Sequence, residues 1–159
     1  MIAVRATEVT LRTVHASDLD AFYLDEIDPE ANRMAVARPR DRAAFQAHWT
    51  RTLVDPTVNE RAILADGVLV GRITCFQQEG RATIGYWITR AHWGRGIASQ
   101  ALARFLEVIP TRPLHARVAV SNVASIRVLE RSGFVLTGVE MSVETERFPA
   151  CDEALMVLM

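Results

Sequence analysis

Cysteine is scarce in this chain of 159 residues, since only Cys75 and Cys151 are present. Two distant thiols in apolar surroundings do not make the framework of a disulfide-rich secreted domain, and we interpret both as reduced core residues. Charge of one sign is also lacking, because the formal net charge is −1 and like charges form no block. This balance disfavours a non-specific grip on DNA or RNA.

Long apolar segments are absent as well. No window reaches the roughly 18 apolar residues that a membrane-spanning helix needs, and Arg5 and Glu8 interrupt an N-terminal segment that does not resemble a leader. His15 and His115 show no metal-ligand spacing with a cysteine or a carboxylate. We therefore expect a cytoplasmic protein that binds neither a membrane nor a metal.

The sequence does contain enough apolar residues for a core. Half of its residues are hydrophobic, and we expect residues 1–159 to form one domain. Alternation of apolar and polar residues predicts a strand over 9–14. Apolar residues at helical spacing predict a helix over 19–27, which the Asp-Pro pair at 28 and 29 would end, and another over 40–53.

The middle of the chain has the pattern of hairpins followed by a crossover. Asp66 and Gly67 separate strand-like runs over 61–65 and 68–76, and a second turn precedes a strand over 82–89. A helix over 97–109 and a strand over 114–120 then require a parallel pair with a right-handed crossover. The chain continues with a helix between Asn122 and Gly133, and with strands over 134–144 and 153–158. We expect an α/β fold with a mixed, mostly antiparallel sheet.

The segment from Trp93 to Ala98 joins the strand over 82–89 to the helix over 97–109 and contains Gly94, Arg95 and Gly96. Glycines allow a backbone to approach an anion closely, and the first N–H groups of a helix have no partner within it. The helix dipole also favours negative charge there. This turn therefore has the pattern of a phosphate-binding loop.

In order and spacing, these motifs resemble the GNAT superfamily of N-acetyltransferases. The resemblance rests on the run from Gly85 to Ile88, the loop and helix from Trp93 to Leu102, Asn122 with Ser125 and Leu129, and Gly133 with Phe134. It covers nearly the whole chain, and the Tyr-Trp strand with the Trp-Gly-x-Gly loop is similar to the RimJ/RimL branch, which acetylates ribosomal-protein N-termini. It implies a GNAT-like sheet with one parallel βαβ crossover and flanking helices.

The resemblance also implies acetyl-CoA as co-substrate and a set of residues that hold it. The loop would cradle the pyrophosphate, the parted strand would pair with the pantetheine arm, and the start of the last helix would contact the pantetheine and the departing thiolate. One backbone N–H, that of Trp87 or Ile88, would bind the thioester oxygen, and Ser125 would be the general acid. The residues so implied are Tyr86, Trp87, Ile88, Thr89, Trp93, Gly94, Arg95, Gly96, Ile97, Ala98, Asn122 and Ser125.

Two positions depart from the family pattern. Ala91 stands where the loop motif has glutamine or arginine, which removes a side chain and leaves the backbone cradle. Thr83 stands where many relatives carry a glutamate, and a threonine cannot act as a general base. Glu79 lies in a turn too distant to replace it, so the base stays open among Glu26, His48, His92, Glu140 and Glu144.

Several further residues have two interpretations each. Tyr23, Phe45 and Trp49 either line the acceptor site or belong to the core, and Asp25, Glu26 and Asp28 either attract a cationic amine or form a solvated helix face. Arg90 either meets the 3′-phosphate or faces solvent, and Gly85 marks either a bulge or close packing. Of Tyr86 and Trp87, one should face the core and the other the substrate.

Three functions remain open at this stage. The first is an N-acetyltransferase, monomeric or homodimeric, that moves an acetyl group from acetyl-CoA to a primary amine on a protein N-terminus or a small molecule, by direct transfer in a ternary complex. The second is a non-catalytic acyl-CoA-binding or sensing module. The third, a nucleotide-binding α/β domain, is disfavoured because such folds place the glycine loop after the first strand of a parallel sheet.

Overall fold

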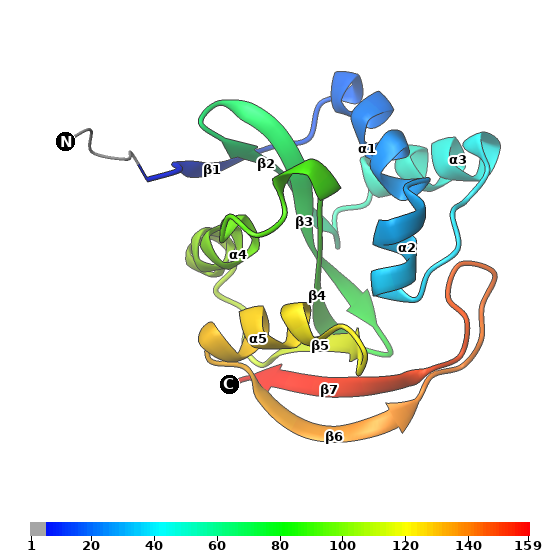
Figure 1. Ribbon diagram of the computed structural model, residues 1–159, viewed down its shortest axis with the longest axis vertical. Coiled ribbons are helices and arrows are strands. Elements are labelled where there is room, and N and C mark those ends of the chain that lie inside the picture. Colours follow the sequence, from blue (N-terminus) through cyan, green and yellow to red (C-terminus); the bar gives the residue numbers. More distant parts are fainter. Residues whose placement is uncertain (1–5) are drawn as a thin grey trace.

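The computed structural model describes residues 6–159. Residues 1–5, on which the expectation about the N-terminal segment partly rests, lie outside the described range. Within that range, seven strands form one sheet in the order β1-β2-β3-β4-β5-β7-β6 (Figure 1). Every neighbouring pair is antiparallel except β4 and β5, which confirms the predicted mixed sheet with one parallel crossover. The strands are Val9–Arg12, Asn59–Ala65, Val68–Gln78, Arg81–Ile88, Leu114–Ala119, Val135–Met141 and Asp152–Leu158 for β1 to β7.

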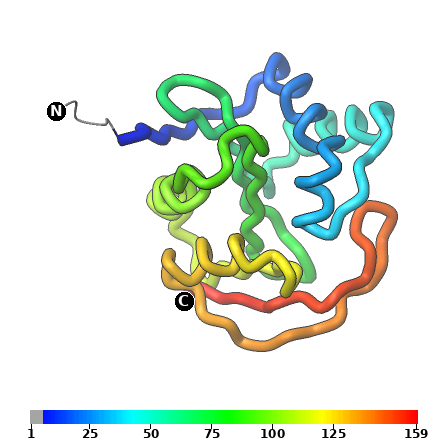
Figure 2. Tube along the Cα trace, viewed as in Figure 1, coloured from blue at the N-terminus to red at the C-terminus, as the bar shows by residue number. Residues whose placement is uncertain are grey.

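Helices cover the two faces of this sheet in separate groups (Figures 1 and 2). Helix α4, Ile97–Val108, packs on the face that carries Ile63 and Ile73, and its Leu102 and Phe105 are fully buried in the main core. The opposite face carries α1, Leu19–Glu26, and α3, Arg42–Thr52, where Phe45 and Trp49 pack on Ala62. The aromatic residues at helical spacing, Tyr23 included, therefore belong to a second hydrophobic cluster.

The structure contains one α-helix, α2, Pro29–Ala35, that the sequence analysis did not predict. Asp28 and Pro29 end α1 as predicted, but they also begin α2. The Asp28 side chain accepts a hydrogen bond from the N–H of Ala31, and Pro29 occupies the first helical position, where its lack of an N–H costs nothing. An Asp-Pro pair can end one helix and begin another. The prediction took it only as the end of a helix and therefore missed α2.

The parallel pair β4–β5 positions the site. Only Thr83 and His115 pair across it, although β4 continues to Ile88 and β5 continues to Ala119. Beyond this single pair the two strands part. Helix α5, Val123–Arg131, starts just after β5 with Asn122 as its N-cap, as predicted.

Gly85 is not at a bulge. The register of β3 with β4 runs without interruption from Gly71 opposite Ile88 to Gln78 opposite Arg81. A Cβ on Gly85 would meet the Thr74 methyl group at 3.5 Å, an ordinary contact. The parting of β4 from β5 therefore requires no irregularity on the β3 side.

Candidate active site

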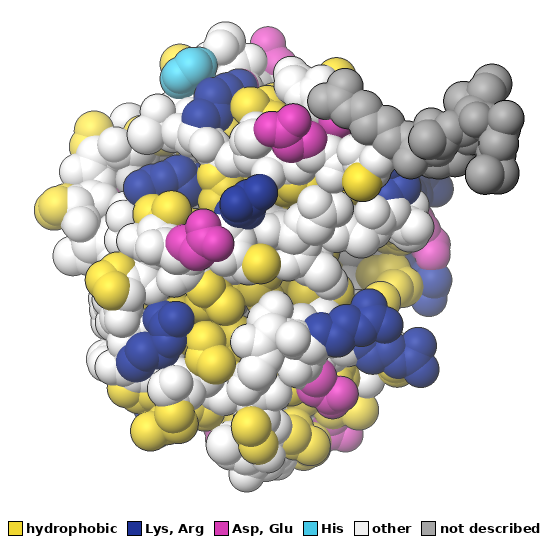
Figure 3. All heavy atoms as spheres, turned by 90° about the vertical axis from the view of Figure 1, so that its left-hand side faces the viewer, with side chains coloured by type: hydrophobic (Ala, Val, Ile, Leu, Met, Phe, Trp, Pro, Cys, Tyr) yellow, Lys and Arg dark blue, Asp and Glu magenta, His cyan; other side chains and the backbone are white. Residues whose placement is uncertain are grey.

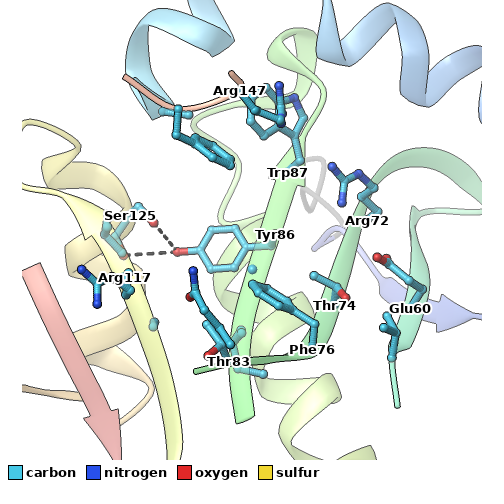
Figure 4. A pocket seen from close by; sticks show the side chains of 18 of the residues that line it. Glu60, Arg72, Thr74, Phe76, Thr83, Tyr86, Trp87, Arg117, Ser125 and Arg147 are labelled. Carbon is cyan, nitrogen blue, oxygen red and sulfur yellow. Dashed lines mark hydrogen bonds between the residues drawn. The ribbon is translucent and has the colours of Figure 1, made fainter. Parts of the chain in front are cut away.

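A cavity of about 540 Å³ occupies the space where β4 and β5 part (Figure 4). It extends from β5 past the edge of β4 and over β3 to α3 and the loop between β6 and β7. Four of the predicted site residues line it, namely Tyr86, Trp87, Asn122 and Ser125. The other predicted residues lie at the end of β4, in the loop that follows it and in the first turn of α4.

The strand register fixes which backbone groups of β4 face the gap. Thr89 donates its N–H to the carbonyl of Val70, and in an antiparallel pair successive residues turn these groups to opposite sides. The polar groups of Trp87 and Thr89 therefore face β3, whereas those of Tyr86 and Ile88 face the gap. Of the two N–H groups considered for the thioester oxygen, only that of Ile88 points to the open side.

The glycine loop completes this edge. Gly94 and Gly96 have φ of 76° and 72°, which is the left-handed region that favours glycine. A Cβ added at either glycine would meet no atom within 4 Å, so space for a ligand lies beside both. The first bond of α4 joins the Gln100 N–H to the Gly96 carbonyl, which leaves the N–H groups of Ile97 and Ala98 ahead of it.

Two side chains of the loop hold it in place. The Trp93 indole donates a 2.8 Å hydrogen bond to the Ile88 carbonyl. Arg95 lies 2.8 Å from Nδ1 of His92 and 3.3 Å from the Thr7 hydroxyl, so its charge stays beside the loop. Arg90 forms an ion pair with Asp28 at 3.1 Å rather than pointing only to solvent.

Tyr86 bridges the gap to α5. Its hydroxyl lies 2.7 Å from the hydroxyl of Ser125 and also donates to the Ser125 carbonyl at 3.2 Å (Figure 4). Burial raises the pKa of Tyr86 to about 12, although the bond to Ser125 opposes the shift, so the phenol stays protonated. Asn122 caps α5 by accepting the Ser125 N–H. The sequence did not predict that Tyr86 and Ser125 form one hydroxyl pair.

Tyr86 and Trp87 divide the two faces of the sheet. Tyr86 packs against the main core, whereas Trp87 lies on the opposite face, with the Arg147 guanidinium 5.5 Å from its ring (Figure 4). Arg147 belongs to the loop between β6 and β7, which hydrogen-bonds to the chain at Arg38. The cavity therefore extends onto the face of Trp87, and we call this part the Trp87 side of the cavity.

Of the base candidates named from the sequence, only His48 lines the cavity. Burial lowers its pKa to about 4, with a further contribution from the charges of Arg40 and Arg72, so it is a weak proton acceptor. The other four are held elsewhere: Glu26 is buried against Arg40, His92 contacts Arg95, Glu140 pairs with Arg117, and Glu144 pairs with Arg38. Thr83 is buried and donates its hydroxyl to the Arg81 carbonyl.

Glu60 is the carboxylate that sequence reasoning missed. It lines the Trp87 side of the cavity, directly opposite Thr74 in β3, and its Oε2 atom is buried with no hydrogen-bond partner in residues 6–159. Burial raises its pKa, while the charge of Arg72 and the Thr74 hydroxyl act against the shift. The predicted strand begins at residue 61, whereas β2 begins at Asn59, so Glu60 falls outside the predicted strand.

The acidic residues of the first helices are engaged within the protein. Glu26 binds Arg40 at 2.7 Å, and Asp28 caps α2. Asp25 accepts a 3.0 Å hydrogen bond from the Thr89 hydroxyl, and burial raises its pKa to about 6. None of the three lines the described cavity, so they give no support to an acidic mouth for a cationic amine.

Replacement of Asp25 by asparagine should stabilise the protein at pH 8. The carboxyl pKa rises from 3.8 to about 6 on folding, so ionised Asp25 opposes folding above that range. Asparagine can still accept from Thr89. We expect a gain of about 1 to 2 kcal/mol in the free energy of unfolding at pH 8, and none at about pH 3, below the unfolded pKa of 3.8, measured by urea denaturation. Glu130→Gln on the exposed side of α5 is the control, and an equal gain at both pH values would contradict the assignment.

The face around α4 carries basic and acidic side chains dispersed among apolar ones (Figure 3). Among the residues that the structure covers, no three or more histidine, cysteine or acidic side chains gather as a metal site would require. None of the helices in residues 6–159 has the length and apolar character of a membrane span.

Comparison with known proteins gives a family match. Residues 8–135 match the model of the acetyltransferase (GNAT) domain. The chain is 30% identical over 145 residues to the uncharacterized N-acetyltransferase p20 of Bacillus licheniformis, a match that covers 82% of this chain and 80% of the relative.

Solved structures with the same fold include enzymes for different acceptors. One is spermidine N-acetyltransferase of Vibrio cholerae in complex with CoA and spermine, with a TM-score of 0.81, 18% identity and 94% of each chain covered. Another is RimL, an acetyltransferase of the ribosomal protein L7/L12 N-terminus, with a TM-score of 0.81 and 21% identity over 99% of this chain and 93% of RimL. At these identities the likeness shows the fold and leaves the acceptor undecided.

Proposed function

This chain belongs to the GNAT family of acetyltransferases, and we propose that it transfers the acetyl group of acetyl-CoA directly to a primary amine while both substrates are bound. It is an N-acetyltransferase with acetyl-CoA as its co-substrate. The observation that carries the mechanism is the cavity, which joins the parted edge of β4 to the Trp87 side. We place the amine on the Trp87 side, which we call the acceptor side from here on. Such a passage allows the amine to reach the thioester without a covalent enzyme intermediate.

In this proposal the chain holds acetyl-CoA mainly by its backbone. Gly94, Gly96 and the first N–H groups of α4 would receive the pyrophosphate, and the free space beside both glycines is compatible with that ligand. The outward polar groups of Tyr86 would pair with the pantetheine arm. The Ile88 N–H would bind the thioester oxygen as its charge grows, while the Ile88 carbonyl accepts the hydrogen bond of the Trp93 indole. Acetyl-CoA supplies the activated acyl group.

We assign proton removal from the acceptor ammonium to Glu60. Among cavity-lining carboxylates, Asp55 hydrogen-bonds to Thr57 and Glu153 to Arg117, whereas Glu60 has an unpartnered oxygen within residues 6–159. Glu60, Thr74 and Gly85 lie opposite one another on three successive strands. Two strand spacings of about 4.8 Å separate Glu60 from the edge of β4, so the proton would travel through a water molecule.

On the other side, the hydroxyl pair of Ser125 and Tyr86 would serve the leaving thiolate. Ser125 borders the gap and shares a 2.7 Å hydrogen bond with Tyr86, which remains protonated at neutral pH. Either hydroxyl can donate a proton to the thiolate, while the other donates a hydrogen bond to the oxygen that has lost its proton. The Ser125 assignment made from the sequence becomes a proposal for the pair.

Replacement of Gly94 by aspartate tests the cofactor loop. The positive φ strains any side chain, and a carboxylate beside the pyrophosphate adds repulsion, so we expect acetyl-CoA affinity to fall at least about tenfold, or ~1.4 kcal/mol. Isothermal calorimetry on the folded variant measures this loss. Gly80→Asp, at another positive-φ glycine in the β3–β4 turn, should bind acetyl-CoA like the wild type. Unchanged affinity of the Gly94 variant would remove the loop from the site.

Thiol release from acetyl-CoA across a panel of amines separates the enzyme from a sensing module on the same fold. The proposal expects release that depends on an added amine, together with thermal stabilisation by acetyl-CoA. Stabilisation without release on any amine or N-terminal peptide would favour the non-catalytic module instead.

A further inference from the structure

The acceptor side of the cavity is lined by three arginines from separate parts of the chain. Arg40 precedes α3, Arg72 lies in β3 opposite Trp87, and Arg147 comes from the loop between β6 and β7. Arg72 and Arg147 stand about equally close to an indole, at 5.3 Å from Trp49 and 5.5 Å from Trp87. An indole ring that stacks on a guanidinium fixes the plane of the guanidinium and leaves the N–H groups at the guanidinium edge available.

Carboxylates satisfy these three arginines only in part. The buried Glu26 lies 2.7 Å from Arg40 and 3.8 Å from Arg147, so one carboxylate serves two guanidinium groups. The guanidinium of Arg72 makes no hydrogen bond or ion pair with any residue from 6 to 159; Glu60 and Asp25 interact with its charge only through space. Within the described cavity, Arg72 is thus a fixed cation with open donors.

The positive charge of these arginines also acts on the neighbouring His48. Four arginines, namely Arg40, Arg72, Arg51 and Arg147, add to burial in lowering the pKa of His48 to about 4. A cationic substrate such as a polyamine would meet this field unfavourably. An anionic group would replace the water around Arg72 with two parallel hydrogen bonds, the arrangement that a guanidinium and a carboxylate favour.

We propose, resting on the proposed acetyl transfer, that the acceptor is a small amine that also carries a carboxylate, and that Arg72, with Arg147 beside it, binds this carboxylate. Arg72 pairs in register with Trp87, the residue before Ile88, so its backbone lies about one strand spacing, ~5 Å, from the backbone of β4. The proposal therefore takes the amine and the carboxylate to belong to one small molecule, as in an amino acid.

Matched acceptors test the proposal on the full-length enzyme. Initial rates of thiol release are compared for free amino acids and the corresponding amino acid amides, which keep the amine and lose the negative charge, and for spermidine. We expect the wild type to prefer acids over amides at least tenfold in kcat/KM, mainly through KM, and to use spermidine poorly. Arg72→Gln should bring the acid-to-amide ratio close to one, and Arg72→Lys should retain part of it.

Arg104→Gln, on the exposed side of α4, is the control and should keep the wild-type ratio. Peptides with an acidic second residue are tested as well, against peptides with a neutral second residue. A preference for the acidic peptides that depends on Arg72 would support binding of a carboxylate by Arg72 and would assign that carboxylate to a peptide side chain. Equal or better use of amides or spermidine overturns this inference and leaves acetyl transfer intact. Absence of release with every amine, while acetyl-CoA still binds, overturns the proposed function itself.

Discussion

Glu60→Gln should lower kcat by at least about a hundredfold at neutral pH, the range that a positioned general base contributes. Glutamine keeps the shape of the side chain but cannot take a proton. Because acetyl-CoA would bind on the other side of β4, its affinity should stay unchanged. In the wild type kcat should rise with pH as Glu60 loses its proton, above the usual range for glutamate since burial raises its pKa, and the variant should lack this rise.

Stability provides the control for this experiment. The folded state of the wild type holds the Glu60 proton to a higher pH than the unfolded chain does, so stability falls as pH rises between the two pKa values. Glu60→Gln should therefore be at least as stable as the wild type at pH 8, although it is less active. A variant that is both destabilised and inactive would indicate a structural role for Glu60, and full activity at pH 7 would return the search to other groups.

Much of the cofactor side could be predicted because it depends on local sequence. The positive φ values of Gly94 and Gly96, the N-cap at Asn122 and the hairpin at Asp66 and Gly67 are each encoded by residues a few positions apart. Such features require no knowledge of distant contacts. The prediction of a mixed sheet followed from their order along the chain.

The acceptor side could not be predicted in the same way, because distant segments form it. Arg147 reaches the cavity from a loop that is held to Arg38, more than a hundred residues earlier in the chain, through the 2.7 Å bond from its side chain. Glu60 and Arg72 share one face only because β2 and β3 pair in the register that sets Glu60 opposite Thr74. A two-residue error at the start of β2 was enough to hide Glu60, and no local signal marked Arg72 as unpaired.

The replacement Gly71→Ala tests whether the position of β4 sets the reaction rate. A Cβ on Gly71 would lie 2.2 Å from the Trp87 carbonyl oxygen, and this contact is with backbone, which cannot rotate away. The β4 strand must therefore shift outward beside Ile88, the proposed oxyanion donor. A displacement of about 1 Å at a reacting centre can cost a hundredfold, so we expect kcat/KM to fall by about that factor. Overpacking should also lower the free energy of unfolding by about 1 to 3 kcal/mol.

Gly138→Ala is the matched control, since a Cβ on that strand glycine of β6 meets no atom within 4 Å. It should leave both the rate and the stability close to wild type. Initial rates at saturating acetyl-CoA, taken below the unfolding transition of each variant, separate a displaced strand from a smaller folded population. If Gly71→Ala lost stability and kept its full rate, the exact place of β4 would not limit the chemistry, and the oxyanion role of Ile88 would lose its main support. A loss of rate in the folded variant would instead tie catalysis to the contact between β3 and β4 beside Ile88.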